Sequence, residues 1–109
     1  MTQSPRTNDA IIDELLGWYG NHYERLSITD KHYLTCTFSW AITDMMDGAS
    51  PDESWDAALD EYSDKIPDAF CFDEISGRQL ARMIYSQFEA LTGELRRSRR
   101  AVMDQLQDG

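Results

Sequence analysis

Carboxylates are the most frequent side chains in this sequence that could do chemistry. The 109 residues include 20 Asp and Glu against 10 Lys and Arg, which gives a net charge of −10. Eleven of the acids lie between positions 44 and 74, where the only base is Lys65. The remaining residues are balanced in charge. This excess of negative charge argues against direct binding to a nucleic-acid backbone or to an anionic membrane.

Six of these acids fall on one predicted helix, and four of them recur at spacings of three and four residues, which places them on one helix face. The six candidate residues are Asp52, Glu53, Asp56, Asp60, Glu61 and Asp64. One interpretation is a solvated face that keeps a small protein soluble. The other is a docking surface for a basic protein, because carboxylates spaced about 5–6 Å apart on a helix can imitate the charge of a phosphate backbone.

A different pairing of acids predicts a magnesium site. Asp44 and Asp47 are three residues apart, as are Glu61 and Asp64, on neighbouring predicted helices. Two such pairs could converge to hold Mg²⁺ against a pyrophosphate. The second pair resembles the ExxD half of all-α nucleotide pyrophosphatases of the MazG kind. The first pair departs from their EExxE half, since it has aspartates where glutamates belong. The resemblance implies a magnesium-dependent pyrophosphatase as an alternative function.

The other chemically versatile residues predict structural roles. The soft metal ligands are His22, His32, Cys36 and Cys71, and only His32 and Cys36 are close enough to share a helix turn. A zinc site needs a second pair of closely spaced His or Cys ligands, so this spacing alone does not define one. The sequence contains no P-loop, GxGxxG, HExxH, GxSxG or CxxC motif. We therefore expect no cofactor, no metal and no enzymatic activity.

Two further segments could contact a partner. Four arginines occupy the run Arg96-Arg97-Ser98-Arg99-Arg100, which suits a solvated face near a helix C-terminus or could pair with the acidic segment. Tyr33 and Trp40 would form a protein-binding strip if they were exposed, whereas burial in a helical bundle is the alternative.

The positions of apolar residues predict four helices, over residues 9–25, 30–47, 50–66 and 76–105. Gly17 and Gly20 fall inside the first, where they indicate close packing or a kink. The connector 67–75 supplies Phe70, Phe72 and Ile75 to the core. The last helix is longer than the others can cover, so its end is expected to fray or to pack on a partner, such as a second copy. Residues 1–7 form an expected flexible tail, and residues 8–109 a single domain.

The sequence thus predicts an all-α bundle of three to four helices with a long C-terminal helix. Two cysteines make no disulfide framework, and neither a signal peptide nor a membrane-spanning apolar run is found, which favours the cytoplasm. The predicted function is a non-enzymatic interaction module that binds a basic, nucleic-acid-binding protein. Two settings fit: an anti-CRISPR-like inhibitor that mimics nucleic-acid charge, or an immunity protein against a basic nuclease. The alternatives are an oligomeric scaffold, with a homodimer through the last helix, and the pyrophosphatase.

Overall fold

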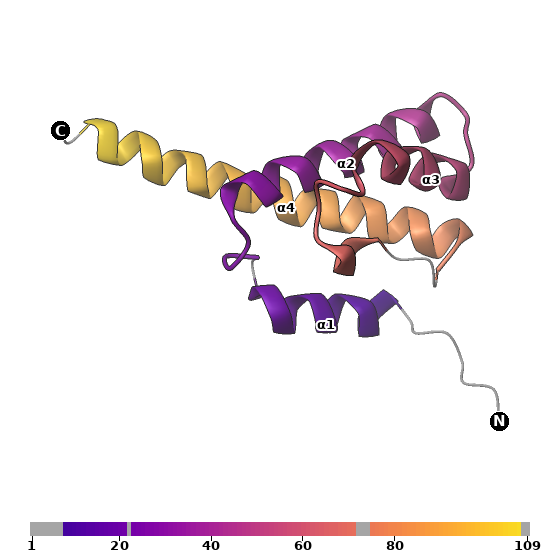
Figure 1. The fold of residues 1–109 in the computed structure, drawn as a ribbon, viewed down its shortest axis with the longest axis horizontal. Helices are drawn as coiled ribbons and strands as arrows, with labels where there is room; N and C mark the ends of the chain where they lie inside the picture. Colours follow the sequence, from indigo (N-terminus) through magenta and orange to yellow (C-terminus); the bar gives the residue numbers. More distant parts are fainter. Residues whose placement is uncertain (1–7, 22, 72–74, 108–109) are drawn as a thin grey trace.

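A computed structural model describes residues 8–21, 23–71 and 75–107. These residues form four α-helices, α1 (Asn8–Tyr19), α2 (Ile28–Met46), α3 (Pro51–Tyr62) and α4 (Gly77–Gln107), with a short 3₁₀ helix, η1 (Asp68–Phe70), and no strand (Figure 1). The all-α prediction with a long last helix is confirmed. The expected tail, residues 1–7, and Phe72 lie outside the described residues. No helix in the described ranges combines the length and apolar character needed to cross a membrane.

Local capping signals set where two of the helices begin. The Ser27 hydroxyl accepts a hydrogen bond from the Asp30 backbone N–H at 3.1 Å, and α2 starts at Ile28, directly after Ser27. The Ser50 hydroxyl accepts one from the Glu53 N–H at 3.2 Å, with Pro51 in the first turn of α3. Each cap satisfies an N–H group that has no partner inside its helix. From the sequence, Ser50 predicts the cap of α3, and this is confirmed; for α2 both Ser27 and Thr29 are possible caps, and the structure has Ser27 in that place.

The first helix is shorter than the sequence predicts. It ends at Tyr19 rather than near residue 25, because Gly20 adopts a φ of +93°, which is outside the helical region. Gly17 lies inside the helix, but a Cβ there would meet nothing within 4 Å. The two glycines therefore differ: Gly17 marks no close contact, whereas Gly20 ends the helix and lies so close to Glu24 that a Cβ there would be 2.4 Å from its carboxylate. Tyr23 and Leu26 still reach the core, from the loop rather than from a helical stripe.

The third helix also ends early. It stops at Tyr62 and Ser63 caps it, whereas the sequence pattern extends to residue 66. After Ser63 the chain forms a turn, in which the Lys65 N–H donates to the Tyr62 carbonyl, three residues back, at 2.9 Å. Pro67 explains why no helix continues past residue 66, since it disfavours helical angles at Ile66, but the helix has already ended at Tyr62. Asp64 therefore lies in the turn after α3, and its predicted place on the helix face is wrong.

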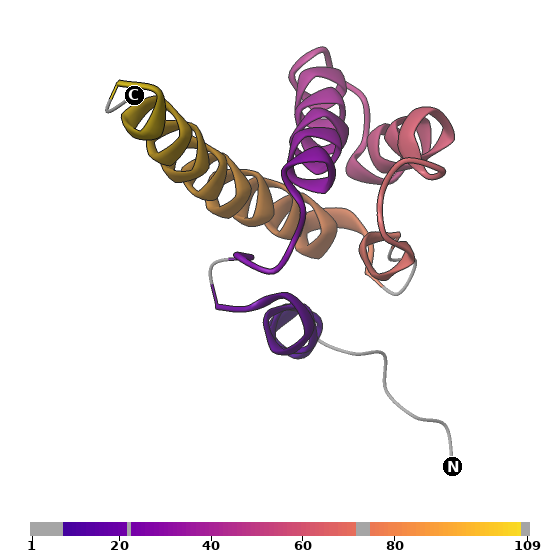
Figure 2. The same cartoon turned by 60° about the vertical axis from the view of Figure 1, so that its left-hand side comes forward.

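The core forms where α2, α3 and α4 meet. In Figure 1, α2 runs beside α4 in the opposite direction, and Figure 2 shows α3 on the far side of α2 from the end of α4. Phe38 of α2 stacks on Trp55 of α3, with ring centroids 5.2 Å apart. Fully buried residues contributed by the three helices include Leu34, Phe38, Ala41, Ala58, Met83, Ile84 and Leu91. On α2 these residues are three or four positions apart, and on α4 Leu91 follows Ile84 by seven positions, so on each of these two helices they lie on one face, which turns inward.

The first helix joins this core through η1. Tyr19 stacks on Phe70 at a centroid distance of 5.6 Å, and Tyr23 contacts the same ring at 5.9 Å. The buried Tyr23 hydroxyl donates a hydrogen bond to the Gln87 side-chain oxygen on α4. Burial raises the pKa of Tyr23 to about 12, so the phenol stays a donor at neutral pH. Phe70 and Ile75 reach the core from the connector, as predicted.

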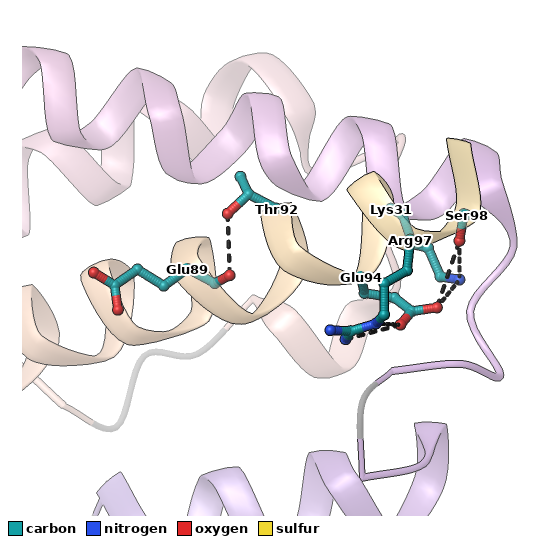
Figure 3. A network of polar contacts seen from close by, with 6 residues as sticks. All are labelled: Lys31, Glu89, Thr92, Glu94, Arg97 and Ser98. Carbon is teal, nitrogen blue, oxygen red and sulfur yellow. Dashed lines mark hydrogen bonds and ion pairs between the residues drawn. The ribbon is translucent and has the colours of Figure 1, made fainter. Parts of the chain in front are cut away.

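A buried ion pair links α2 to α4. Lys31 Nζ lies 3.1 Å from Glu94 Oε1, and both residues are buried (Figure 3). The second Glu94 oxygen binds Arg97 at 3.1 Å, and Ser98 Oγ lies 3.4 Å from Lys31 Nζ. Burial acts to raise the pKa of Glu94. Hydrogen bonds from Lys31 and Arg97, together with their charges, outweigh burial and hold this pKa below its ordinary value.

Past this ion pair, α4 continues without a neighbouring helix. Its 31 residues span about 46 Å at 1.5 Å per residue, whereas the 19 residues of α2 span about 28 Å. The C-terminal end of α4 therefore projects from the bundle (Figure 1). Every described side chain from Arg99 to Leu106 is exposed. Val102 follows Leu91 and Leu95 on the apolar side of this helix, but it is 44% exposed, whereas those two leucines are buried.

Two glycine substitutions should have opposite effects on stability. A Cβ on Gly20 would lie 2.4 Å from the Glu24 carboxylate, and its φ of +93° is unfavourable for alanine, so Gly20→Ala should lower the free energy of unfolding by about 1 kcal/mol or more. Gly17→Ala should raise it by about 0.5–1 kcal/mol, because the site is helical and open. Urea denaturation of both variants checks this. Equal effects would contradict the end of α1 at Tyr19.

Removing one partner of the buried ion pair should cost more than removing both. Lys31→Met should lower the free energy of unfolding by about 3 kcal/mol, since the Glu94 carboxylate then stays buried with only Arg97 to pair with. The double variant Lys31→Met/Glu94→Leu should recover most of this loss, because apolar side chains fill the same space. Urea denaturation measures both. A double variant as unstable as the single one would contradict a compensating pair.

The same pair predicts how stability depends on pH. The folded-state pKa of Glu94 lies below the ordinary 4.5, so ionised Glu94 stabilises the fold above that pH. This contribution is lost as the pH falls below 4.5 and through the lowered folded-state pKa. Glu94→Gln should therefore flatten the acid limb of the stability profile, whereas the exposed control Glu89→Gln should leave its slope unchanged. Equal slopes in all three proteins would contradict this account.

Candidate functional site

The predicted acidic residues gather on the exposed face of α3. Helical geometry places them opposite the face that carries Ser54, Trp55 and Ala58, which are buried. We call these five exposed acids the acidic face: Asp52, Glu53, Asp56, Asp60 and Glu61. None of them forms an ion pair with a base in the described ranges. The face therefore presents unneutralised negative charge along about 14 Å of helix.

Two of the six predicted residues differ from the other four. Asp52 is exposed, but one of its carboxylate oxygens also accepts a hydrogen bond from the Gly77 N–H at 3.4 Å. This contact joins the start of α3 to the start of α4, so Asp52 has a structural role beside its charge. Asp64 is exposed in the turn after α3 and extends the negative charge beyond the helix end without belonging to the acidic face.

An aromatic cluster lies between α2 and the end of α3. Tyr62 contacts Trp40 edge-to-face at a centroid distance of 6.1 Å and Tyr33 at 6.5 Å. Trp40 is 43% exposed and Tyr33 is half-buried. The Lys65 ammonium lies over the Tyr62 ring, 5.6 Å from its centroid. Of the two interpretations of Tyr33 and Trp40, the structure favours an accessible strip, with Tyr62 as an additional member.

A groove of about 530 Å³ runs beside this cluster. The rings of Trp40, Tyr62 and Phe88 and the carboxylate of Asp44 line it, together with hydroxyl groups of α2. Asp44 is half-buried, and its carboxylate forms no ion pair with a described residue. The groove thus combines aromatic surface with one unneutralised carboxylate, a combination that suits a cation.

The metal sites considered from the sequence find no support in the described ranges. No group of three or more His, Cys, Asp or Glu side chains there could hold a metal ion. Asp44 and Asp47 therefore do not converge with Glu61 and Asp64 into a magnesium site. Cys36 and Cys71 are free thiols. Burial and the nearby Asp68 charge raise the pKa of Cys71, which makes it a weaker nucleophile. His22 lies outside the described residues.

A second surface lies at the projecting end of α4. Val102, Met103 and Leu106 are exposed there, and Ile28 is exposed at the start of α2. A groove of about 390 Å³ separates the two helices, and Leu95 forms part of its wall. We call these residues the apolar end: Ile28, Leu95, Val102, Met103 and Leu106. The arginines of the basic run lie on the same length of α4, and all four are exposed.

Comparison with known protein families, curated proteins and solved structures gives no match to this chain. The functional argument therefore rests on the surfaces described above.

Sequence reasoning missed two features of these surfaces. Tyr62 was assigned to the apolar stripe of its helix, but it also lines the groove beside Trp40. The Lys31–Glu94 pair was not anticipated. The signal was present, since Lys31 lies three residues before Leu34 and Glu94 three after Leu91, both of which are core residues. A charged residue in register with a buried stripe on each of two helices is a pattern that predicts an interhelical ion pair.

Proposed function

We propose that this protein is a non-enzymatic interaction module whose acidic face binds a basic surface on a nucleic-acid-binding protein. One observation carries the proposal: five exposed carboxylates share the outer face of α3, and no described base neutralises them. Carboxylates three and four residues apart on a helix repel by a few tenths of a kcal/mol per pair. Helix stability alone therefore does not favour the arrangement, whereas attraction of a basic partner does.

The proposed activity is competition for a site built for nucleic acid. Carboxylates on successive helix turns are about 5–6 Å apart and present a row of negative charge, as a phosphate backbone does. Such a row steers a basic partner toward α3 and speeds association at low salt. Inhibition of a nuclease or of a DNA-binding complex follows if the row occupies the nucleic-acid site. An anti-CRISPR-like inhibitor and an immunity protein both act in this way.

Charge reversal on α3 should weaken partner binding. Asp56→Lys/Asp60→Lys should reduce capture of a basic protein from the native host's lysate by about tenfold, because it removes attraction at the centre of the acidic face. The matched control is Asp13→Lys/Glu89→Lys, which changes the net charge equally at two exposed mid-helix positions on α1 and α4. Quantitative mass spectrometry of the captured proteins, at low and high salt, measures the effect.

The controls of this experiment separate a specific face from general acidity. The proposal is supported if the control variant still captures the basic protein, the α3 variant no longer does, and binding by the wild-type protein weakens as salt rises. Equal capture by both variants and the wild-type protein contradicts it. Circular dichroism of each variant establishes that the helices are intact. A partner of neutral charge that resists high salt also contradicts the proposal.

A second candidate function, a self-assembling scaffold, has one observation in its favour. The apolar end exposes four large side chains at the place where α4 leaves the bundle, and three of them, Ile28, Val102 and Met103, line the groove there. An interface with two-fold symmetry needs such a self-complementary patch, because each copy must offer both a ridge and a groove.

An aspartate at the apolar end should abolish self-association if the scaffold function is correct. Leu106, 71% exposed, is the test position, and Met46, 78% exposed at the far end of α2, is the matched control. We expect Leu106→Asp to be monomeric and Met46→Asp to be dimeric in sedimentation-velocity runs at about 100 μM, because a charge at the interface core is costly to bury. A monomeric wild-type protein, or a dimeric Leu106→Asp, contradicts the scaffold function.

A further inference from the structure

The groove beside Trp40 has the components of a site for a cationic side chain. Its walls carry aromatic rings from α2, α3 and α4 and one carboxylate, Asp44. Asp44 follows Trp40 by four residues, which places it one helical turn further along the same side of α2. An indole and a carboxylate one turn apart can contact the same bound group.

The aromatic cluster already holds a cation of this chain. The Lys65 ammonium lies 5.6 Å from the Tyr62 ring centroid, within the range of a cation–π contact. Tyr62 in turn meets Trp40 edge-to-face, with an interplanar angle of 76°. Trp40 is 43% exposed, and no described base lies over its ring. Tryptophan is the strongest cation–π acceptor of the aromatic residues. Trp40 is therefore a stronger acceptor than Tyr62, yet the cation lies over Tyr62.

The carboxylate in the groove is likewise unneutralised. Asp44 is half-buried, and it pairs with no described lysine or arginine. The groove also adjoins the acidic face, because Glu61 of that face directly precedes Tyr62 of the groove wall. The surrounding charge is therefore negative, with Lys65 as the one base among the residues named here. A basic partner drawn to α3 would bring its cationic side chains to this groove.

We infer that the groove binds an arginine side chain of the basic partner, with the guanidinium stacked on Trp40 and paired with Asp44. Arginine fits better than lysine, because its planar guanidinium can stack on an indole while donating two hydrogen bonds to a carboxylate, whereas an ammonium is a compact point charge. The inference rests on the proposed function and adds a specificity element to it. The acidic face attracts positive charge of either kind, and the groove selects arginine.

The test compares nona-arginine with nona-lysine as defined probes, using the full-length protein at low salt and measuring both dissociation constants by calorimetry. The wild-type protein should prefer nona-arginine. Trp40→Leu should reduce this preference about threefold, as should Asp44→Asn, because each removes one contact specific to the guanidinium. The matched controls are Trp18→Leu, at an indole 54% exposed on α1, and Asp13→Asn, at an exposed acid of the same helix. Both should keep the wild-type ratio.

The outcomes separate failure of the groove from failure of the proposed function. If Asp56→Lys/Asp60→Lys weakens binding of both peptides but Trp40→Leu and Asp44→Asn keep the wild-type ratio, the groove is not an arginine site. The same conclusion follows if the wild-type protein binds the two peptides equally. If the charge reversal on α3 changes neither dissociation constant, the proposed function fails. Loss of the preference in both groove variants, with intact helical circular dichroism, supports the inference.

Discussion

The register of α2 against α4 is set at one buried contact, between Lys31 and Glu94. Two charges removed from water are costly unless they are paired, so any slip of α2 along α4 that separated them would leave two buried charges without partners. Apolar side chains pack on either side of this point, but they tolerate small slips that an ion pair does not. The pair thereby fixes how far α2 covers α4, and consequently where the exposed end of α4 begins.

This geometry gives the molecule two different exposed surfaces. The acidic face and the groove beside Trp40 belong to the bundle, where α3 packs on α2 and orients its carboxylates outward. The apolar end belongs to the part of α4 that α2 does not reach. One surface suits charged recognition and the other apolar contact. The two surfaces do not overlap, so neither of the two proposed interactions would block the other.

The candidate site was only partly predictable. The positions of Asp52, Glu53, Asp56, Asp60 and Glu61 on one face follow from helical periodicity, and the structure has all five exposed. The place of Asp64 was wrong because the helix ends at Tyr62, before the limit that Pro67 imposes, and Asp64 lies in the turn that the Lys65 N–H closes onto the Tyr62 carbonyl. The groove could not be derived in this way. It needs Tyr62 and Phe88 beside α2, and which rings meet there depends on how three helices pack.

The all-α class, the serine cap of α3 and the length of the last helix could be derived from the sequence, whereas for α2 both Ser27 and Thr29 were possible caps. Capping and periodicity act within one or two helical turns, so they are readable from neighbouring residues. The tertiary structure decided that Lys31 pairs with Glu94, 63 positions away, and that Trp40 is left exposed. Those outcomes depend on which faces meet, because burial of a side chain is a property of the packed helices and not of its neighbours in the chain.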